Sequence, residues 1–206
     1  MPKQSNNRDL PEAITRLKLC IAFKPCGHVG VVDAFDKSDA GVLYVYDDNS
    51  LGYTDWTNIT PAPEMESKCL KVTNPNNDTI VLLPLDGRIL TGENSTRGGV
   101  CDGMVLTQKE MCLVEFKTNA DSENFHTIIE RANKGITQLS NTFEKVIKPN
   151  CATQNIDIEK MLSIEFYVVF DKSLNVTSAK AELMELQAQF LINNKHSLYF
   201  NNEKSF

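Results

Sequence analysis

The chain contains 206 residues, with 41% hydrophobic side chains, 23% charged side chains and a formal net charge of −6. These proportions match soluble globular proteins, which excludes a disordered, fibrous or repetitive chain and leaves enough residues for one domain with its own core. The apolar runs at 80–83 and 166–170 stop far short of the roughly 20 residues that a membrane-spanning helix requires. The N-terminus is polar and lacks the apolar segment of a signal peptide, so we expect a cytoplasmic protein with no membrane association.

Six cysteines are scattered through the chain without a Cys-x-x-Cys pair, which favours reduced, buried thiols. Cys26 and His28 lie close together, but a zinc site needs four convergent ligands and no second pair stands at a familiar spacing. The acidic total argues against an extended basic surface for nucleic acid, although a local basic patch can coexist with it. Enzymes that hold divalent metals also contribute carboxylates to their own sites, so the net charge does not exclude a nucleic-acid enzyme.

Residues 1–60 are expected to form an N-terminal β-rich portion, either as an extension or as part of the same domain as residues 61–206. Apolar and β-branched runs separated by Pro and Gly predict strands after a short helix at 10–18, and these strands lie at 19–23, 29–35 and 41–46. The segment 47–63 is rich in Asp, Asn, Thr and Pro, which predicts a loop and marks the boundary between the two parts.

A three-stranded meander is predicted next, after a short helix around 64–72. Its strands are expected at 79–83, 98–106 and 111–117. The tight turn at 107–110 joins the last two strands, which are therefore expected to pair antiparallel.

The clearest helix follows the meander, because apolar residues recur at spacings of three, four and seven between Phe125 and Ile147. Asp121 and Glu123 suit its N-terminus, and Pro149 is expected to end it.

A buried strand at 163–170 and a last helix at 178–193 complete the pattern. The order of strand, strand, strand, long helix, strand and helix predicts an α/β fold with a mixed central sheet flanked by helices.

Two charged side chains, Glu115 and Lys117, interrupt the last strand of the meander. Because side chains alternate across a strand, both project from one face while Val114 and Phe116 enter the other. Antiparallel pairing across the turn brings Asp102 near Glu115, and neighbouring strands roughly 4.8 Å apart let two carboxylates share one hard cation. Two buried like charges would be costly without such a partner, so the pattern predicts a metal site.

These residues resemble a known superfamily. The run Arg97-Gly98-Gly99-Val100-Cys101-Asp102, the tripeptide Glu115-Phe116-Lys117 and a following helix with Gln138-Leu139 resemble the PD-(D/E)xK, or restriction-endonuclease-like, nucleases, in the branch with a glutamine on that helix. The resemblance covers roughly residues 79–170 and implies the restriction-endonuclease-like sheet. Cys101 stands where the family name has a proline.

The resemblance implies metal-dependent hydrolysis of a phosphodiester bond. Asp102 and Glu115 would hold Mg²⁺ or Mn²⁺. Lys117 would orient or help deprotonate the attacking water and stabilise charge on the phosphate, and Gln138 would complete the catalytic set.

The family often adds an acidic metal ligand from a helix before the sheet, and the candidates are Glu66, which we take as the metal ligand, and Glu64. On the long helix, Arg131 and Thr142 share the flank of Gln138, either bordering the cleft or as a solvated helix face.

The expected function is therefore a nuclease acting on nucleic acid, DNA ahead of RNA, in a prokaryotic or phage defence, restriction or repair setting. A homodimer or a protein partner is compatible with the sequence. The alternative is an inactive nuclease-fold protein that acts as a binding or assembly subunit, and metal binding discriminates between the two.

Overall fold

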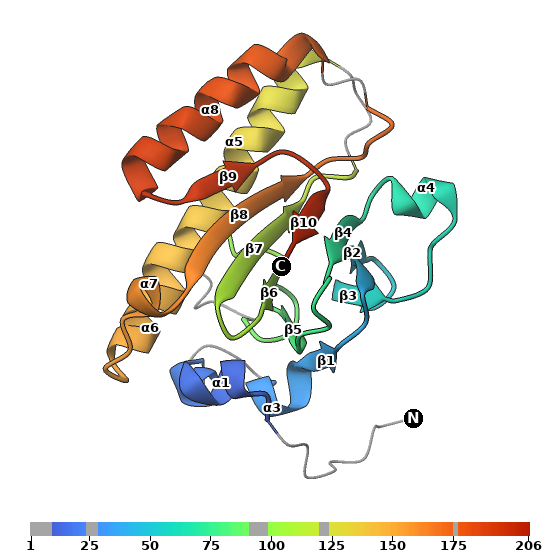
Figure 1. Cartoon of the computed structure of the whole chain (residues 1–206). Helices are drawn as coiled ribbons and strands as arrows, with labels where there is room; N and C mark the ends of the chain where they lie inside the picture. Colours follow the sequence, from blue (N-terminus) through green and yellow to red (C-terminus); the bar gives the residue numbers. More distant parts are fainter. Residues whose placement is uncertain (1–9, 24–28, 91–98, 120–123, 175–176) are drawn as a thin grey trace.

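The computed structural model describes residues 10–23, 29–90, 99–119, 124–174 and 177–206, and it is a mixed α/β protein in which two sheets are flanked by helices (Figure 1). The larger sheet has the strand order β1 (Asp36–Ser38), β5 (Ile80–Pro84), β6 (Gly103–Leu106), β7 (Glu110–Phe116), β8 (Ser163–Val169) and β9 (Ser197–Tyr199). The smaller sheet has the strand order β10 (Glu203–Ser205), β4 (Leu70–Thr73), β2 (Val42–Asp48) and β3 (Tyr53–Thr57).

The helices fall into an N-terminal group, a long central run and a C-terminal group. They are α1 (Glu12–Arg16), α2 (Leu19–Ala22), α3 (Val31–Ala34), α4 (Pro63–Glu66), α5 (Phe125–Asn141), the π-helical η2 (Thr142–Ile147), α6 (Lys148–Ala152), α7 (Ile158–Met161), the 3-10 turn η3 (Thr177–Ala179) and α8 (Lys180–Asn194).

The predicted meander is confirmed. Strand β5 pairs antiparallel with β6, and β6 pairs antiparallel with β7 in a register that places Gly103 opposite Val114. The chain then passes through α5 and returns as β8, which pairs parallel with β7, as the order of elements predicted.

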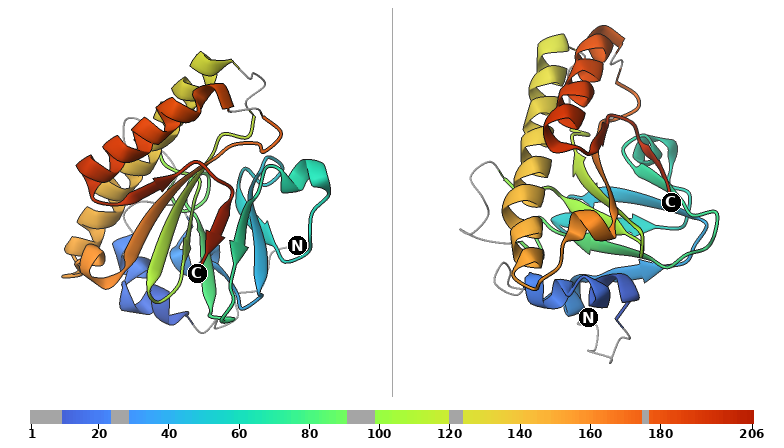
Figure 2. Two further views of the ribbon diagram at one scale, coloured as in Figure 1. Left: turned by 45° about the horizontal axis from the view of Figure 1, so that its top comes forward. Right: turned by 60° about the vertical axis from the view of Figure 1, so that its left-hand side comes forward.

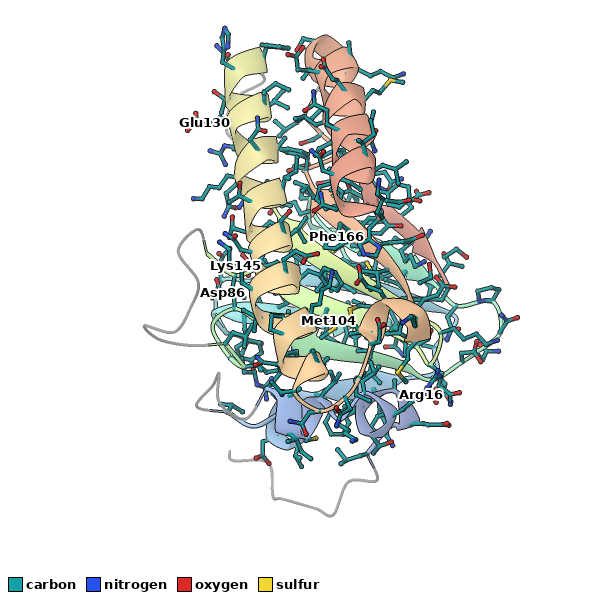
Figure 3. All side chains as sticks on the ribbon, turned by 90° about the vertical axis from the view of Figure 1, so that its left-hand side faces the viewer. Arg16, Asp86, Met104, Glu130, Lys145 and Phe166 are labelled. Carbon is teal, nitrogen blue, oxygen red and sulfur yellow. The ribbon has the colours of Figure 1, made fainter. Side chains whose placement is uncertain are left out.

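Strand β7 is buried on both faces, because helices cover one side of the larger sheet and the smaller sheet covers the other (Figure 2). Leu113 packs in the core on the helix side, together with Met104 and Phe166 (Figure 3). Val114 packs in the other core, with Val72 of the smaller sheet. The alternation read from the sequence therefore assigns Glu115 to the helix side.

Two segments expected to be strands, 19–23 and 29–35, form the short helices α2 and α3, so the N-terminal portion is less β-rich than predicted. Strand β1 already pairs with β5 at that edge of the larger sheet. The apolar residues of α2 and α3, such as Leu19 and Val31, are instead buried in the core on the helix side. Tertiary packing has overridden the local β propensity of these segments.

The loop expected over 47–63 contains strand β3, which forms a hairpin with β2. The Asp48 carboxylate accepts from the backbone N–H groups of Ser50 (2.7 Å) and Leu51 (3.1 Å), and Gly52 has a φ of 72°, so this polar segment is a tight turn. The helix expected around 64–72 is limited to α4, and β4 follows it. Because β2 pairs with β4, strands from both sides of residue 60 share one sheet.

We predicted that the long helix ends at Pro149, but the helix does not end there. It continues from α5 through the π-helical turn η2 into α6, which contains Pro149 in its first turn. A proline inside a regular α-helix loses a hydrogen bond and clashes with the carbonyl four residues earlier. The wider turn before Pro149 shifts the helical register, which removes that conflict. Asp121 and Glu123 lie outside the described residues, and Asn124 caps α5 by accepting from His126 N at 2.9 Å.

The C-terminal strands β9 and β10 were not predicted, because three residues are too few to show an alternating pattern. Lys204 fixes β10 from inside the protein. Its ammonium lies 2.6 Å from a Glu110 carboxylate oxygen and 2.9 Å from a Glu165 oxygen, and its side chain is only 4% exposed. Among the described helices, none combines the length and the apolar character needed to cross a membrane.

Candidate active site

Asp102 and Glu115 meet at one end of the β6–β7 ladder. Asp102 directly precedes β6 and lies one position beyond the pair formed by Gly103 and Val114, so continuing the register places it opposite Glu115. Directly opposite residues in an antiparallel pair have Cα atoms about 4.5–5.5 Å apart. The structure thus brings together the two carboxylates that the sequence analysis paired.

Asp102 is held from both its backbone and its side chain. Its carboxylate oxygen Oδ2 accepts from the backbone N–H of Phe116 at 2.6 Å, and its carbonyl accepts from Leu85 N at 2.9 Å. These bonds tie Asp102 to β7 on one side and to the end of β5 on the other. Asp102 also helps to line a pocket.

Glu115 is the most buried acidic residue of the site, with 1% of its surface exposed. One carboxylate oxygen, Oε1, forms an ion pair with Lys117. The other, Oε2, is buried without a hydrogen-bond partner among the described residues. A methyl group added at Gly135 of α5 would lie 3.5 Å from Glu115 Cγ, so the helix covers this side chain closely. A buried polar atom left unpaired costs free energy, which indicates a further ligand or proton at Oε2.

Gln138 holds Lys117 in place from the opposite side. Lys117 Nζ donates to Gln138 Oε1 at 2.8 Å, and Gln138 Nε2 donates to the carbonyl of Val100 at 3.2 Å. The backbone of Lys117 is fixed as well, because its N–H donates to Val169 O at 2.7 Å. Both ends of the Gln138 amide are used, so the ammonium group has a defined position beside Glu115.

Replacing Gln138 by Ala is expected to lower the rate of the phosphodiester cleavage expected from the sequence by about 10–100-fold. This is the usual cost of removing a supporting partner of a site residue. The helix should be retained, since Gln and Ala both favour helix formation. Catalytic rate and melting temperature are to be measured together, with Gln189→Ala on the exposed face of α8 as the matched control. Equal rates for the two variants would contradict a positioning role for Gln138.

A polar pocket of ≈ 240 Å³ opens beside Asp102. Asp47, from the β2–β3 hairpin, and Asp86, from the loop after β5, share its lining with Asp102 and Thr54. The two loops touch: Gly87 has a φ of 71°, and a side chain there would come within 2.1 Å of the Gly52 carbonyl. The smaller sheet therefore contributes one wall of the candidate site.

Asp47 and Asp86 were missed in the sequence analysis. Asp86 lies within the turn Pro84-Leu85-Asp86-Gly87, and Asp47 lies at the end of an apolar strand, so each had an ordinary structural explanation. Their placement beside Asp102 depends on how the two sheets pack, which no local pattern encodes. The signal that could have identified Asp47 was its position as an acidic residue at the end of a buried strand.

Glu66, predicted to be the third metal ligand, does not line the pocket, and neither does Glu64. Glu66 is the last residue of α4, and its carbonyl accepts from Cys69 N at 3.1 Å where the chain turns into β4. The β2–β3 hairpin, rather than α4, lies against Asp102, so the acidic neighbours of Asp102 come from different elements than expected.

Of the other predicted flank residues, Thr142 is fully buried and structural. Its hydroxyl accepts from Cys101 N at 2.8 Å and donates to Gln138 O at 2.8 Å, which anchors the segment leading to Asp102. Arg131 is half-buried on α5 and does not line the pocket. Cys26, His28, Arg97 and Gly98 lie outside the described residues.

Burial and mutual repulsion make the carboxyl groups of the site hard to ionise. The pKa of Asp102 rises to about 7, mainly through burial, against the opposing effect of the Phe116 hydrogen bond. The pKa of Glu115 rises to about 8, through burial and the charge of Asp102, against the favourable effect of Lys117. Burial also raises the pKa of Asp47 and of Asp86. Such raised pKa values are typical of groups that ionise fully only beside a cation.

The metal-free protein is expected to lose stability as the pH rises. A carboxyl whose folded-state pKa is raised stabilises the fold fully below its unfolded pKa of about 4, and this contribution is lost as the pH rises through the folded pKa. For Asp102 and Glu115 that loss extends to about pH 7 and 8. Melting temperatures in chelator from pH 5.5 to 9 should fall, and should fall less in Glu115→Gln. A slope unchanged by that substitution would contradict this assignment.

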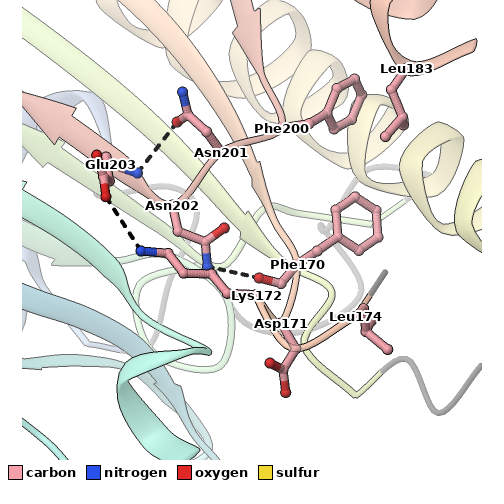
Figure 4. A pocket seen from close by; sticks show the side chains of 9 residues that line it. All are labelled: Phe170, Asp171, Lys172, Leu174, Leu183, Phe200, Asn201, Asn202 and Glu203. Atoms are coloured by element: carbon pink, nitrogen blue, oxygen red, sulfur yellow. Dashed lines mark hydrogen bonds and ion pairs between the residues drawn. The ribbon is translucent and has the colours of Figure 1, made fainter. Parts of the chain in front are cut away.

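A second pocket, of ≈ 260 Å³, lies where β8 ends and includes Phe170, Phe200 and Leu183 (Figure 4). Its polar groups already bond to one another: Asn202 Nδ2 donates to Phe170 O at 2.8 Å, and Lys172 lies 3.5 Å from Glu203. The groups best placed to bind a ligand or to react are therefore those around Asp102 and Glu115.

A hydrated divalent cation fits the residues at this site. Among the described residues, no group of three or more histidine, cysteine, aspartate or glutamate side chains could hold a metal ion. Mg²⁺ usually takes only one or two carboxylates and keeps several waters. The unpartnered Glu115 Oε2 and the neighbouring Asp102 supply two such carboxylates.

Comparison of the chain with protein-family models, with curated protein sequences and with solved structures found no match.

Proposed function

We propose that this protein is a metal-dependent nuclease that hydrolyses phosphodiester bonds at Asp102, Glu115 and Lys117. The observation that carries the proposal is the buried Glu115, whose Oε1 forms an ion pair with Lys117 and whose Oε2 has no hydrogen-bond partner within the described part of the chain. The arrangement of meander, long helix and parallel strand around these residues supports a restriction-endonuclease-like core.

Asp102 and Glu115 are assigned to hold Mg²⁺ or Mn²⁺. When bound, the cation supplies Lewis-acid polarisation of the phosphate and a water of lowered pKa. The two carboxylates are suited to this because their geometry is fixed by the β6–β7 ladder, by Phe116 N and by the covering helix. Their raised pKa values mean that cation binding and loss of protons from these groups are coupled.

We assign two roles to Lys117. It orients or helps to deprotonate the attacking water, and it stabilises negative charge on the reacting phosphate. The Lys117 side chain is 11% exposed, so it is shielded from bulk solvent but still reachable from the site. In a water-poor site a fixed positive charge stabilises developing negative charge more strongly than in solution. Gln138 keeps that charge beside Glu115.

The test is a cleavage assay with Mg²⁺, Mn²⁺ or chelator on plasmid DNA, single-stranded DNA and RNA, with the Glu115→Gln variant alongside. We expect metal-dependent cleavage of at least one substrate, DNA ahead of RNA, and none by the variant. Metal binding without cleavage of any substrate would favour the alternative, a binding or assembly subunit that keeps the nuclease site.

A further inference from the structure

Helix α8 lies beside α5 at the surface of the molecule, and its outward face is apolar (Figure 1). Leu183 and Phe190 attach the helix to the core on its inner side. Met184, Leu191 and Ile192 are instead 60%, 50% and 67% exposed, and they are three of the seven large hydrophobic side chains that are exposed among the described residues. Single exposed hydrophobic side chains are ordinary, whereas a group of them on one helix indicates an interaction surface.

The exposed apolar residues of α8 form one stripe along the helix. At roughly 100° per residue, they all lie within about 60° of the direction of Ala188, and Leu183 and Phe190 point to the opposite side. The stripe consists of Ala181, Met184, Ala188, Leu191 and Ile192, all of them exposed. Apolar residues at spacings of three and four form the seam along which two helices pack against each other. The small side chain of Ala188, in the middle of the stripe, allows a second helix to come close.

Two charged side chains lie on the same face as the stripe. Glu185 belongs to the first half of α8, and Lys195 caps its C-terminal end. Glu185 Oε1 accepts from Gln189 Nε2 at 2.9 Å, and Lys195 Nζ donates to the carbonyl of Ile192 at 2.9 Å. Neither forms an ion pair with another side chain in the part of the chain that the structure describes. The face therefore complements a partner that brings one basic and one acidic group to it.

A second copy of this chain brings these charges when two α8 helices pack antiparallel across a two-fold axis. Glu185 and Lys195 are about 15 Å apart along the helix, at 1.5 Å per residue. With the axis level with Phe190, midway between them, Glu185 of each copy faces Lys195 of the other, and Ala188 faces Ile192. The symmetry forms each contact twice. Parallel packing would place like charges against each other, so the charges favour the antiparallel arrangement.

We infer that α8 is a homodimerisation surface, on which the apolar stripes of two copies pack antiparallel between two Glu185–Lys195 ion pairs. The helix is roughly 22 Å long at 1.5 Å per residue, which is short for the interface of about 800 Å² per partner that stable complexes usually bury. The dimer is therefore expected to dissociate on dilution. The inference does not rest on the proposed function, because α8 carries none of the residues of the candidate active site.

The test is sedimentation velocity of the full chain at protein concentrations from low micromolar to submillimolar. We expect the wild type to pass from monomer to dimer over this range. Leu191→Glu places a charge in the seam and should leave a monomer throughout. Leu51→Glu, in the β2–β3 turn, is the matched control, because Leu51 is 46% exposed against 50% for Leu191, and it should dimerise as the wild type does. Melting temperatures of dilute samples show that the variants keep their fold.

Reversing the charges tests the antiparallel arrangement. Glu185→Lys and Lys195→Glu should each raise the dissociation constant of the dimer by about tenfold, because the symmetry converts two ion pairs into two repulsions. The double variant should return to within about threefold of the wild type, as expected for two groups that contact each other.

A wild type that stays monomeric at the highest concentration would overturn the inference. So would a dimer that survives Leu191→Glu, or single charge reversals that the double variant does not rescue. Absence of cleavage by the wild type would contradict the proposed function and would leave the outcome of these measurements unaffected.

Discussion

Glu115→Gln and Asp102→Asn are each expected to reduce cleavage to the level of the chelator-treated protein. Both substitutions keep the shape of the side chain and remove the charge that a divalent cation requires. Asn at position 102 can still accept from Phe116 N, and Gln at position 115 can still contact Lys117, so the fold around the site is preserved. The loss is therefore attributable to metal binding rather than to misfolding.

The same substitutions should stabilise the metal-free protein above neutral pH. Each removes a buried carboxyl group whose ionisation is opposed by burial and by its neighbour. A gain of about 2 kcal/mol would raise the melting temperature by about 4–8 °C in a protein of this size. Glu130→Gln, on the exposed surface of α5, is the matched control and should change neither cleavage nor stability (Figure 3). Full cleavage by either site variant would contradict the assignment.

Lys117→Ala is expected to lower the cleavage rate by about 100-fold or more, the usual range for removing one electrostatic stabiliser of a transition state. The affinity for Mn²⁺ should not fall to the same extent, because the carboxylates remain. The pKa of Glu115 should rise further once its neighbouring ammonium is removed, since Lys117 now lowers it. Cation binding should therefore require a higher pH in this variant.

Lys117→Arg separates charge from geometry. Arginine keeps the positive charge but cannot reproduce the contact of a single ammonium with both Glu115 Oε1 and Gln138 Oε1. We expect partial recovery of cleavage relative to Lys117→Ala. Rates measured at saturating Mn²⁺ distinguish loss of chemistry from loss of metal, and a wild-type rate for Lys117→Ala would remove this residue from the mechanism.

The central part of the site could be predicted because its geometry is local. Alternation along β7 assigns Glu115 and Lys117 to one face, and a short turn fixes the register that brings Asp102 to Glu115. Gln138 was placed by family resemblance, and the structure brings it to Lys117. The relation of Asp102 to Glu115 and Lys117 needs no knowledge of how distant segments pack.

The remaining part depends on contacts between distant segments. Asp47 reaches the site only because the β2–β3 hairpin packs against the larger sheet. The hairpin was not predicted, because the polar composition of its second strand and turn indicated a loop. Segments 19–23 and 29–35 are apolar enough for strands, but β1 occupies the sheet edge and packing makes them helical. Pro149 predicted a helix end that the preceding π-helical turn avoids. In each case tertiary structure decided between local alternatives.

The most direct test of the central claim, that Asp102 and Glu115 hold a divalent cation, is the melting temperature of the metal-free protein as Mn²⁺ is added. A ligand present at 100 times its dissociation constant stabilises the folded state by about 2.7 kcal/mol, equivalent to roughly 5–11 °C for a chain of this length. We expect a rise of this size in the wild type, reversed by chelator, and a much smaller rise in Asp102→Asn. A melting temperature that Mn²⁺ leaves unchanged in the wild type, or raises equally in Asp102→Asn, would contradict the claim.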